Sequence, residues 1–439
     1  MALSGIQIYK LLPQTNCKEC GFPTCLAFAM KLAAKQVELS LCPYVSDESK
    51  AQLAESAAPP VRLVTLKSDG YQVKAGNEVV LFRHEKTFYN KPGLFVQVSD
   101  LESSPAIQEK IRAVDAYTTN YVGMDFTVDG IAVKAEAGGG EKFHAAIEAV
   151  RSVSKRPLIL ISSDPAVIEA GLKALSGECP LVCGADASNW EAMAAVAKAG
   201  KAALTVKSGD LEELADLTEK IKATGLEDLV LWPQADNLGA SLVLKTQIRR
   251  LALKKNFRAL GYPIIDFADT PEAAAQAMAK YAGFVVIDHF APELVYPLLV
   301  LRENIYTDPQ KPIQVQPGIY EINNPKPDSP VLVTTNFSIT YFSVANEVEG
   351  SGLPAWLLVT DAEGMSVLTA WAAGKFDAER IAKSIKSFGI ADKVSKKLVV
   401  LPGHVAVLSG ELEEELPDWE VRVGPREAVD LPKFMKMAL

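Results

Sequence analysis

The stretch PLILISSDPAVIEAGLKAL, residues 157–175, decides the fold because it joins a buried strand to an amphipathic helix. Its first part is a continuous apolar run, and Asp164-Pro165 is typical of the N-terminus of the helix that follows. A continuous apolar strand followed by such a helix is the repeating unit of a parallel sheet that helices cover on both faces.

The same unit recurs along the middle of the chain. Eight strands, each followed by a helix, are expected at 94–99, 124–133, 157–163, 180–185, 202–208, 228–233, 263–269 and 284–289. Eight units predict a closed (β/α)8 TIM barrel, and two earlier β runs, at 62–68 and 78–85, are expected to cap its bottom. An open doubly wound sheet is the alternative.

Polar residues at the strand ends would line the mouth of such a barrel. They are Ser162, Ser163, Asp164, Asp186, Trp232, Asp236, Asn237, Asp266, Asp288 and His289. Asp164 and Asp269 also fit the role of helix N-caps, and no set of these residues has the spacing of metal ligands or of a catalytic triad.

Four of the six cysteines precede the barrel, in the pattern C-x2-C-x4-C-x16-C formed by Cys17, Cys20, Cys25 and Cys42. Structural disulfides are disfavoured in a reducing compartment. Zinc sites usually use two CxxC-like pairs, whereas one is present here. Thiolates from a bent loop and a remote Cys-Pro favour an iron–sulfur cluster, with zinc as the alternative. The remaining cysteines, Cys179 and Cys183, are expected to be buried core residues.

Composition excludes several classes of protein. The 439 residues carry a net charge of −9 without a basic cluster, which argues against a nucleic-acid partner. No apolar run reaches the roughly 20 residues that span a membrane, and the N-terminus lacks the features of a signal peptide, so a cytoplasmic protein is expected. A small-residue linker at 55–60 and a proline-rich break at 308–330, expected to have little regular structure, suggest domains at 1–57, 58–320 and 321–439.

The last domain alternates strands and helices, which predicts a Rossmann-like, three-layer unit. Its strand ends are rich in small polar residues and glycine, which suit a large polar ligand. They are Thr334, Thr335, Asn336, Ser338, Thr340, Ser343, Thr369, Gly403, Ser409, Gly410 and Gly424. Neither G-x-G-x-x-G nor G-x-x-x-x-G-K-[ST] follows a strand, so nucleotide binding is weakly supported.

Taken together, these features resemble one family. The CxxCGxPTC loop, the distant Cys-Pro, the barrel and the tail segments 336–349, 367–376, 401–417 and 423–428 resemble the large (gamma) subunit of the corrinoid iron–sulfur protein. That protein belongs to the reductive acetyl-CoA (Wood–Ljungdahl) pathway, the acetyl-CoA synthase/CO dehydrogenase system. The resemblance covers essentially the whole chain.

The resemblance implies the cofactors and their sites. It implies a 4Fe–4S cluster on Cys17, Cys20, Cys25 and Cys42, and a base-off, cobalamin-type corrinoid on the C-terminal domain with no protein histidine on cobalt. It places Thr369 beneath the corrin as the catalytic residue. It also implies corrinoid contacts from Thr335, Asn336, Ser338, Thr340, Tyr341, Ser343, Gly364, Met365, Ser366, Thr369, Ala370, Gly403, Ser409, Gly410 and Ala428.

The histidines agree with that expectation, because none of the four lies in a D-x-H-x-x-G motif. In the tail, His404 of LPGHVAV is expected to be a loop residue.

The resemblance also implies a function and partners. A methyl-transfer component of this family pairs with a smaller subunit as a heterodimer. It takes a methyl group from methyltetrahydrofolate through a separate methyltransferase and delivers it to the nickel site of acetyl-CoA synthase, while the cluster returns Co(II) to Co(I). The alternatives are a pterin-dependent barrel methyltransferase, with folate at Asp164, Asp186 and Asn237, and a zinc-binding scaffold subunit without corrinoid.

Overall fold

The computed structural model describes residues 4–33, 36–50, 53, 59–307 and 313–438. Most of the linker predicted at 55–60, and residues 308–312 of the proline-rich break, therefore lie outside the described residues. The chain divides into two compact units, one of residues 1–117 and 127–306 and one of residues 118–126 and 307–439. Among the described residues, no helix has the length and apolarity that crossing a membrane requires.

The N-terminal segment folds around a small apolar cluster. Two helices, α1 (Gly5–Leu11) and α2 (Cys25–Ala33), pack against each other. Ser4 and Gln7 form a capping box that starts α1. The cluster beneath them contains Ile8, Leu12, Cys25, Phe28, Ala29, Cys42, Val45 and Leu53.

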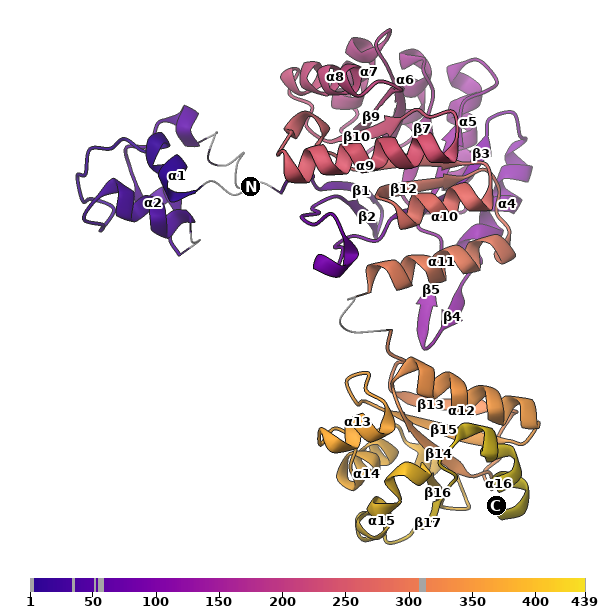
Figure 1. Ribbon diagram of the computed structural model, residues 1–439. Helices are drawn as coiled ribbons and strands as arrows, with labels where there is room; N and C mark the ends of the chain where they lie inside the picture. The colour runs from indigo at the N-terminus through magenta and orange to yellow at the C-terminus, as the bar shows by residue number, and fades with distance from the viewer. Residues whose placement is uncertain (1–3, 34–35, 51–52, 54–58, 308–312, 439) are drawn as a thin grey trace. The chain divides into compact units, whose positions relative to one another are not determined.

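Eight parallel strands close into a barrel, in the order β10-β11-β12-β3-β6-β7-β8-β9 (Figure 1). The strands are β3 (Gly93–Ser99), β6 (Gly130–Lys134), β7 (Leu158–Ile161), β8 (Leu181–Ala185), β9 (Ala203–Ser208), β10 (Leu229–Pro233), β11 (Ile264–Ala268) and β12 (Ala282–Ile287). The helices that follow them are α4 (Ser104–Ala116), α5 (Gly140–Arg151), α6 (Pro165–Lys173), α7 (Trp190–Ala199), α8 (Leu211–Ala223), α9 (Leu238–Lys254), α10 (Pro271–Ala279) and α11 (Pro292–Tyr306). The closed barrel predicted from the sequence is confirmed, and the open sheet is excluded.

A two-stranded hairpin fills the bottom of the barrel. Strands β1 (Val64–Ser68) and β2 (Tyr71–Ala75) pair across the tight turn at Asp69-Gly70, where Gly70 has φ +81°. Val64, Leu66, Val73 and Ala75 join the core inside the barrel, so the predicted cap is present. Its second strand is not at 78–85, as predicted, but at 71–75, because the chain turns at Asp69-Gly70 and pairs back at once.

The chain leaves the barrel between α4 and β6 to form a second hairpin. Strands β4 (Thr119–Tyr121) and β5 (Met124–Phe126) pair antiparallel and belong to the other compact unit. The strand predicted at 124–133 is therefore wrong in its extent: it divides into β5 and the barrel strand β6.

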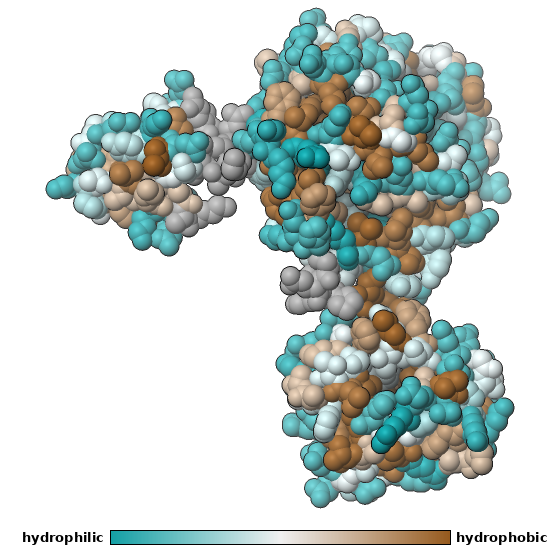
Figure 2. Space-filling model, in the orientation of Figure 1, coloured by the Kyte–Doolittle hydropathy of each residue, from teal (hydrophilic) through white to brown (hydrophobic). Residues whose placement is uncertain are grey.

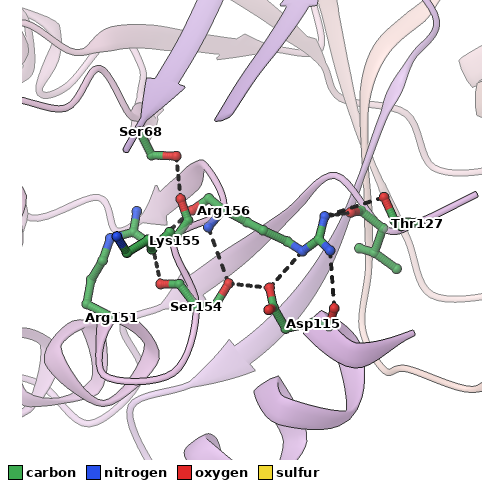
Figure 3. Close-up of polar contacts among 8 residues, drawn as sticks. Ser68, Asp115, Thr127, Arg151, Ser154, Lys155 and Arg156 are labelled. Carbon is green, nitrogen blue, oxygen red and sulfur yellow. Dashed lines mark hydrogen bonds and ion pairs between the residues drawn. The ribbon is translucent and has the colours of Figure 1, made fainter. Parts of the chain in front are cut away.

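Arg156 holds together the two points where this hairpin begins and ends (Figure 3). Its side chain is buried, and its Nε donates to Asp115 Oδ1 at 2.8 Å, near the end of α4. Its guanidinium also donates to the carbonyl of Val128, just after the hairpin. Ser154 Oγ donates to the same Asp115 oxygen at 2.8 Å. The Arg156 guanidinium thus links Asp115 and Val128, the residues on either side of the inserted hairpin.

The second unit is a three-layer α/β structure, as predicted. Its sheet has the order β13-β15-β14-β16-β17, in which β13 is antiparallel and the other four strands are parallel. The strands are β13 (Gly318–Ile322), β14 (Val331–Thr335), β15 (Ala355–Thr360), β16 (Leu398–Leu401) and β17 (Glu420–Val423). The helices are α12 (Ser338–Ser351), α13 (Val367–Ala372), α14 (Ala378–Ser387), α15 (Ser409–Glu415) and α16 (Leu431–Ala438). Helices α13, α14 and α15 share one core cluster with the sheet, and α12, α16 and the β4–β5 hairpin share the other.

The break predicted at 308–330 contains a strand that the sequence analysis missed. Strand β13 lies at the edge of the sheet and pairs with β15 along one of its sides. Edge strands tolerate the proline-rich flanks that made this segment read as a linker. The predicted domain boundary at 320/321 falls inside β13, whereas the two compact units divide at Tyr306/Thr307.

We expect Arg156→Ala to lower the free energy of unfolding by about 3 kcal/mol, because it leaves Asp115 without its charged partner and the Val128 carbonyl without its buried donor. Urea unfolding followed by circular dichroism measures this. Lys155→Ala is the matched control: Lys155 pairs with Asp69 on the exposed side of the same loop, so its removal should change stability by about 0.5 kcal/mol or less. Equal effects of the two substitutions would contradict the role assigned to Arg156.

Candidate functional site

The cysteine loop is an irregular turn between α1 and α2. Gln14, Asn16 and Lys18 have φ of 59°, 50° and 67°, a conformation that costs free energy in residues other than glycine. The Asn16 side chain accepts a hydrogen bond from the backbone N–H of Cys25 at 2.8 Å, which closes the loop at the start of α2. Such strain, held in place by side-chain hydrogen bonds, is typical of binding loops.

A second contact joins this loop to the segment that carries Cys42. The Tyr44 hydroxyl donates to Glu19 Oε1 at 2.7 Å, and this hydrogen bond raises the pKa of Tyr44. Cys25 and Cys42 are buried in the same apolar cluster, Cys20 packs against it, and Cys17 is exposed. All four are free thiols, so the donor set fits thiolate ligation of a cluster.

Within the described ranges, no three His, Cys, Asp or Glu side chains are grouped as the ligands of one metal ion. The assignment of the four cysteines to a cluster therefore stays a prediction. Cys183 behaves as expected of a core residue, since it is fully buried and its burial raises the pKa of the thiol to about 12.

The C-terminal unit has a cavity of about 310 Å³ at the carboxyl ends of its strands. In the sheet, β14 lies between β15 and β16. The next strand in the chain, β15, is added on one side of β14, and β16 is added on the other, so the strand order reverses between β14 and β16. Residues from the ends of both strands line the cavity, together with α12 and the segment after β17. Ligands of open α/β sheets bind at such switch points.

Four of the predicted corrinoid contacts line this cavity: Thr340, Ser343, Ser366 and Ala428. The others lie nearby or in the core but do not line it. Thr335 ends β14, Ser338 begins α12, and Gly403 begins the turn after β16. Ser409 and Gly410 begin α15. Tyr341 packs against Tyr320, Met365 packs on the core, and Ala370 is fully buried.

Thr369 lies on α13, and its side chain is exposed. Its hydroxyl lies 3.0 Å from that of Ser366, which does line the cavity. The two hydroxyls therefore form a pair at the edge of the cavity.

Two buried hydroxyls remain without a hydrogen-bond partner among the described residues, those of Thr334 and Thr335 at the end of β14. Thr334 lines the cavity. Buried polar atoms without partners are rare in folded proteins, and one at a cavity wall is expected where a ligand or water completes the hydrogen bond.

Sequence reasoning missed the apolar residues around this site. After each of the four parallel strands comes a strongly exposed apolar residue: Ile339, Leu368, Val407 and Val429. In Figure 2 hydrophobic atoms lie between hydrophilic ones on the surface of this unit. In a sequence, apolar residues near strand ends are usually interpreted as core residues. Their position after the predicted strands could have indicated that they lie near a ligand site.

His404, expected to be a loop residue, lies in the turn after β16 and lines the cavity. Its Nε2 is 3.8 Å from Glu427 Oε1.

The mouth of the barrel holds a separate cavity of about 760 Å³. Lys245, which is almost completely buried, forms an ion pair there with Asp266. Burial raises the pKa of Asp266, although Lys245 acts against that rise. Of the predicted strand-end residues, Trp232, Asp236, Asn237, Asp266 and Asp288 line the cavity, as does Asp269.

The three residues proposed for folate do not form one site. Asp164 caps α6 by accepting from Ala166 N at 2.9 Å, and Asn237 caps α9 by accepting from Ala240 N at 2.9 Å. Asp186 accepts from Ser188 and lies 3.2 Å from Lys207, and these contacts lower its pKa although burial alone would raise it. Asn237 lines the barrel cavity, whereas Asp164 and Asp186 are not among its lining residues.

Comparison with known proteins agrees with this architecture. The family model described as "CO dehydrogenase/acetyl-CoA synthase delta subunit" matches residues 63–435. A second model, described as "Putative Fe-S cluster", matches residues 12–44, which contain the four cysteines of the loop.

Two curated relatives match almost the whole chain. The "Corrinoid/iron-sulfur protein large subunit" of Moorella thermoacetica is 44% identical over 445 residues, covering 100% of both chains. The "Acetyl-CoA decarbonylase/synthase complex subunit gamma" of Methanopyrus kandleri is 34% identical and covers 99% of this chain and 97% of that protein.

Among solved structures, a dihydropteroate synthase from Thermus thermophilus is similar to the barrel. It is 18% identical, has a TM-score of 0.39 and covers 55% of this chain and 98% of that one.

The two full-length relatives and the family model lead to one conclusion: the chain belongs to the CO dehydrogenase/acetyl-CoA synthase subunit family, as a relative of the corrinoid/iron-sulfur protein large subunits.

Proposed function

We propose that this chain is the large subunit of a corrinoid methyl carrier. The carrier takes a methyl group from methyltetrahydrofolate through a partner methyltransferase and passes it to the nickel site of acetyl-CoA synthase. The observation that supports it most is the cavity at the switch point between β14 and β16, which the exposed apolar residues Ile339 and Leu368 help to line. A base-off corrinoid bound there supplies a cobalt that, as Co(I), is the methyl-accepting nucleophile.

The residues of the C-terminal unit fit such a ligand in two ways. A cavity of about 310 Å³ is at the lower end of the roughly 300–1,000 Å³ of ligand pockets, so it would take a side substituent and leave the ring at the mouth. Ile339, Leu368, Val407 and Val429 would contact the faces of the ring and exclude water. The free hydroxyl of Thr334, which lines the cavity, would hydrogen-bond the inserted part.

The Ser366–Thr369 pair supplies neutral oxygen atoms at the edge of the cavity. A hydroxyl beneath the ring would be a weaker axial donor than an imidazole, and weak axial donation makes Co(I) easier to reach. We therefore assign Thr369 to the lower face and propose that no histidine of this chain binds the cobalt.

The N-terminal segment would hold a 4Fe–4S cluster on Cys17, Cys20, Cys25 and Cys42. Such a cluster supplies single electrons at low potential, which restores Co(I) after accidental oxidation. The buried cluster around Cys25 and Cys42 would limit access of water, and Asn16 and Tyr44 would hold the loop in shape.

Exposed apolar residues near a ligand site also indicate that another protein covers them. We propose that a smaller subunit covers Ile339, Leu368, Val407 and Val429 in a heterodimer, with the ring between the two proteins. The pterin-dependent methyltransferase is weaker as an alternative, because Asp164 and Asn237 serve as helix caps.

The proposal is tested by an anaerobic visible spectrum, with iron and cobalt analysis, of the chain co-expressed with its smaller partner. We expect about four iron atoms and one cobalt per heterodimer, and a Co(I) band on low-potential reduction. Zinc in place of iron, with no cobalt, would overturn the proposal in favour of a scaffold subunit.

The cluster assignment predicts the effect of Cys42→Ser. The variant should lose most of its iron and its reduced-cluster electron paramagnetic resonance signal, because the fourth thiolate comes from Cys42. The matched control is Cys179→Ala, outside the loop, which should retain about four iron atoms. Full iron content in Cys42→Ser would remove this residue from the ligand set.

The role of Thr369 predicts a change in the cobalt chemistry of Thr369→Val. The substitution keeps the shape of the side chain and removes its hydroxyl, so both the Co(II)/Co(I) midpoint and the methylation rate should change. His404→Ala is the control, since it lines the same cavity and is not assigned to the cobalt. A midpoint that responds to His404→Ala and ignores Thr369→Val would reverse the assignment.

A further inference from the structure

Asn336 occupies the centre of the C-terminal unit, with its side chain 1% exposed. Its Oδ1 accepts hydrogen bonds from the backbone N–H of Ala362 at 2.9 Å and of Gly364 at 3.0 Å. Its Nδ2 donates to Gln314 Oε1 at 3.2 Å and to Asp361 Oδ1 at 3.3 Å. All of the side chain's hydrogen-bonding capacity is thus used within the protein, and none remains for a ligand.

The turn that Asn336 holds is strained. It joins β15 to α13, and within it Glu363 and Gly364 have φ of 54° and 73°. Two consecutive left-handed residues persist where surrounding contacts enforce them. A side chain at position 364 would place its Cβ 2.8 Å from Gln314, so the turn is also closely packed.

This turn leads directly to the hydroxyl pair at the cavity. Ser366 is the N-cap residue of α13, and Thr369 lies in its first turn. The position of both depends on where the turn ends, because Ser366 follows Gly364 by two residues.

We infer that Asn336 is a positioning residue: it fixes the 361–364 turn and thereby places Ser366 and Thr369 at the cavity, and it does not contact the ligand. For the corrinoid, the inference rests on the proposed function. It replaces the role predicted from the sequence, in which Asn336 itself binds the cofactor.

The role requires an amide. An aspartate would still accept from Ala362 and Gly364, but it could not donate to Gln314 and would place a carboxylate beside that of Asp361. A second chain segment pairs with the main chain here, since Val315 N donates to the backbone carbonyl of residue 336 at 2.9 Å. Gln316 N in turn donates to Val122 O of the β4–β5 hairpin at 3.1 Å.

The first test is amide hydrogen exchange on the full chain without cofactor. In Asn336→Ala, which removes the acceptor of both amides, Ala362, Gly364 and α13 should exchange faster, on the order of tenfold. The control is Asn323→Ala, which removes another asparagine side chain whose Nδ2 donates to the carbonyls of Val348, Glu349 and Leu353, none of which lines the cavity. Unchanged exchange at 362 and 364 in Asn336→Ala would overturn the inference.

The second test uses the corrinoid-loaded heterodimer. The Co(II) electron paramagnetic resonance spectrum of Asn336→Asp should change in the same sense as that of Thr369→Val, and the spectrum of Asn323→Ala should match the wild type. Faster exchange with an unchanged cobalt spectrum would overturn the link to Thr369. A wild-type heterodimer that binds no corrinoid would refute the proposed function, and the exchange experiment would still decide the positioning role.

Discussion

Burial of parallel strands on both faces is the constraint on which the rest of this structure depends. In the barrel and in the C-terminal sheet, the parallel strands have helices or other strands on each side, so their side chains are mostly apolar; the edge strand β17, with the sequence EVRV, is the exception. Polar groups are thereby displaced to the strand ends. Both cavities therefore open where the parallel strands end, although they lie in different compact units.

Several charged groups of the barrel unit are buried together with their partners. Lys245 with Asp266 and Arg249 with Glu78 are buried ion pairs, and the buried Arg156 side chain donates to four oxygen atoms. A buried ion pair adds little stability over an apolar replacement, but removal of one partner is costly. Such groups determine which arrangement the chain adopts. Arg156 holds Asp115 and Val128 in place where the chain runs into and out of the β4–β5 hairpin.

The repeating part of the fold could be predicted from the sequence, because each barrel strand carries its own apolar run and is followed by a helix, and α6, α8, α9 and α10 begin at a capping side chain. The parts of the fold that were predicted wrongly depend on pairing with other segments of the chain. Strand β2 is short and half-exposed, and β13 is defined by its bonds to β15. The four cysteines were visible from their spacing, whereas the role of Asn336 was not, since four hydrogen bonds to residues 22 to 28 positions away leave no local signal.

The two candidate sites are built in different ways, and this difference has a physical consequence. The cavity between β14 and β16 is formed by the ends of regular strands and helices. The cysteine loop has few regular hydrogen bonds and three left-handed residues that are not glycine, so its shape depends on Asn16, Tyr44 and the small cluster around Phe28. A ligand that binds four thiolates there adds its binding free energy to the folding of the segment. The N-terminal segment should therefore depend on its cofactor for stability, whereas the C-terminal unit should fold first and bind afterwards.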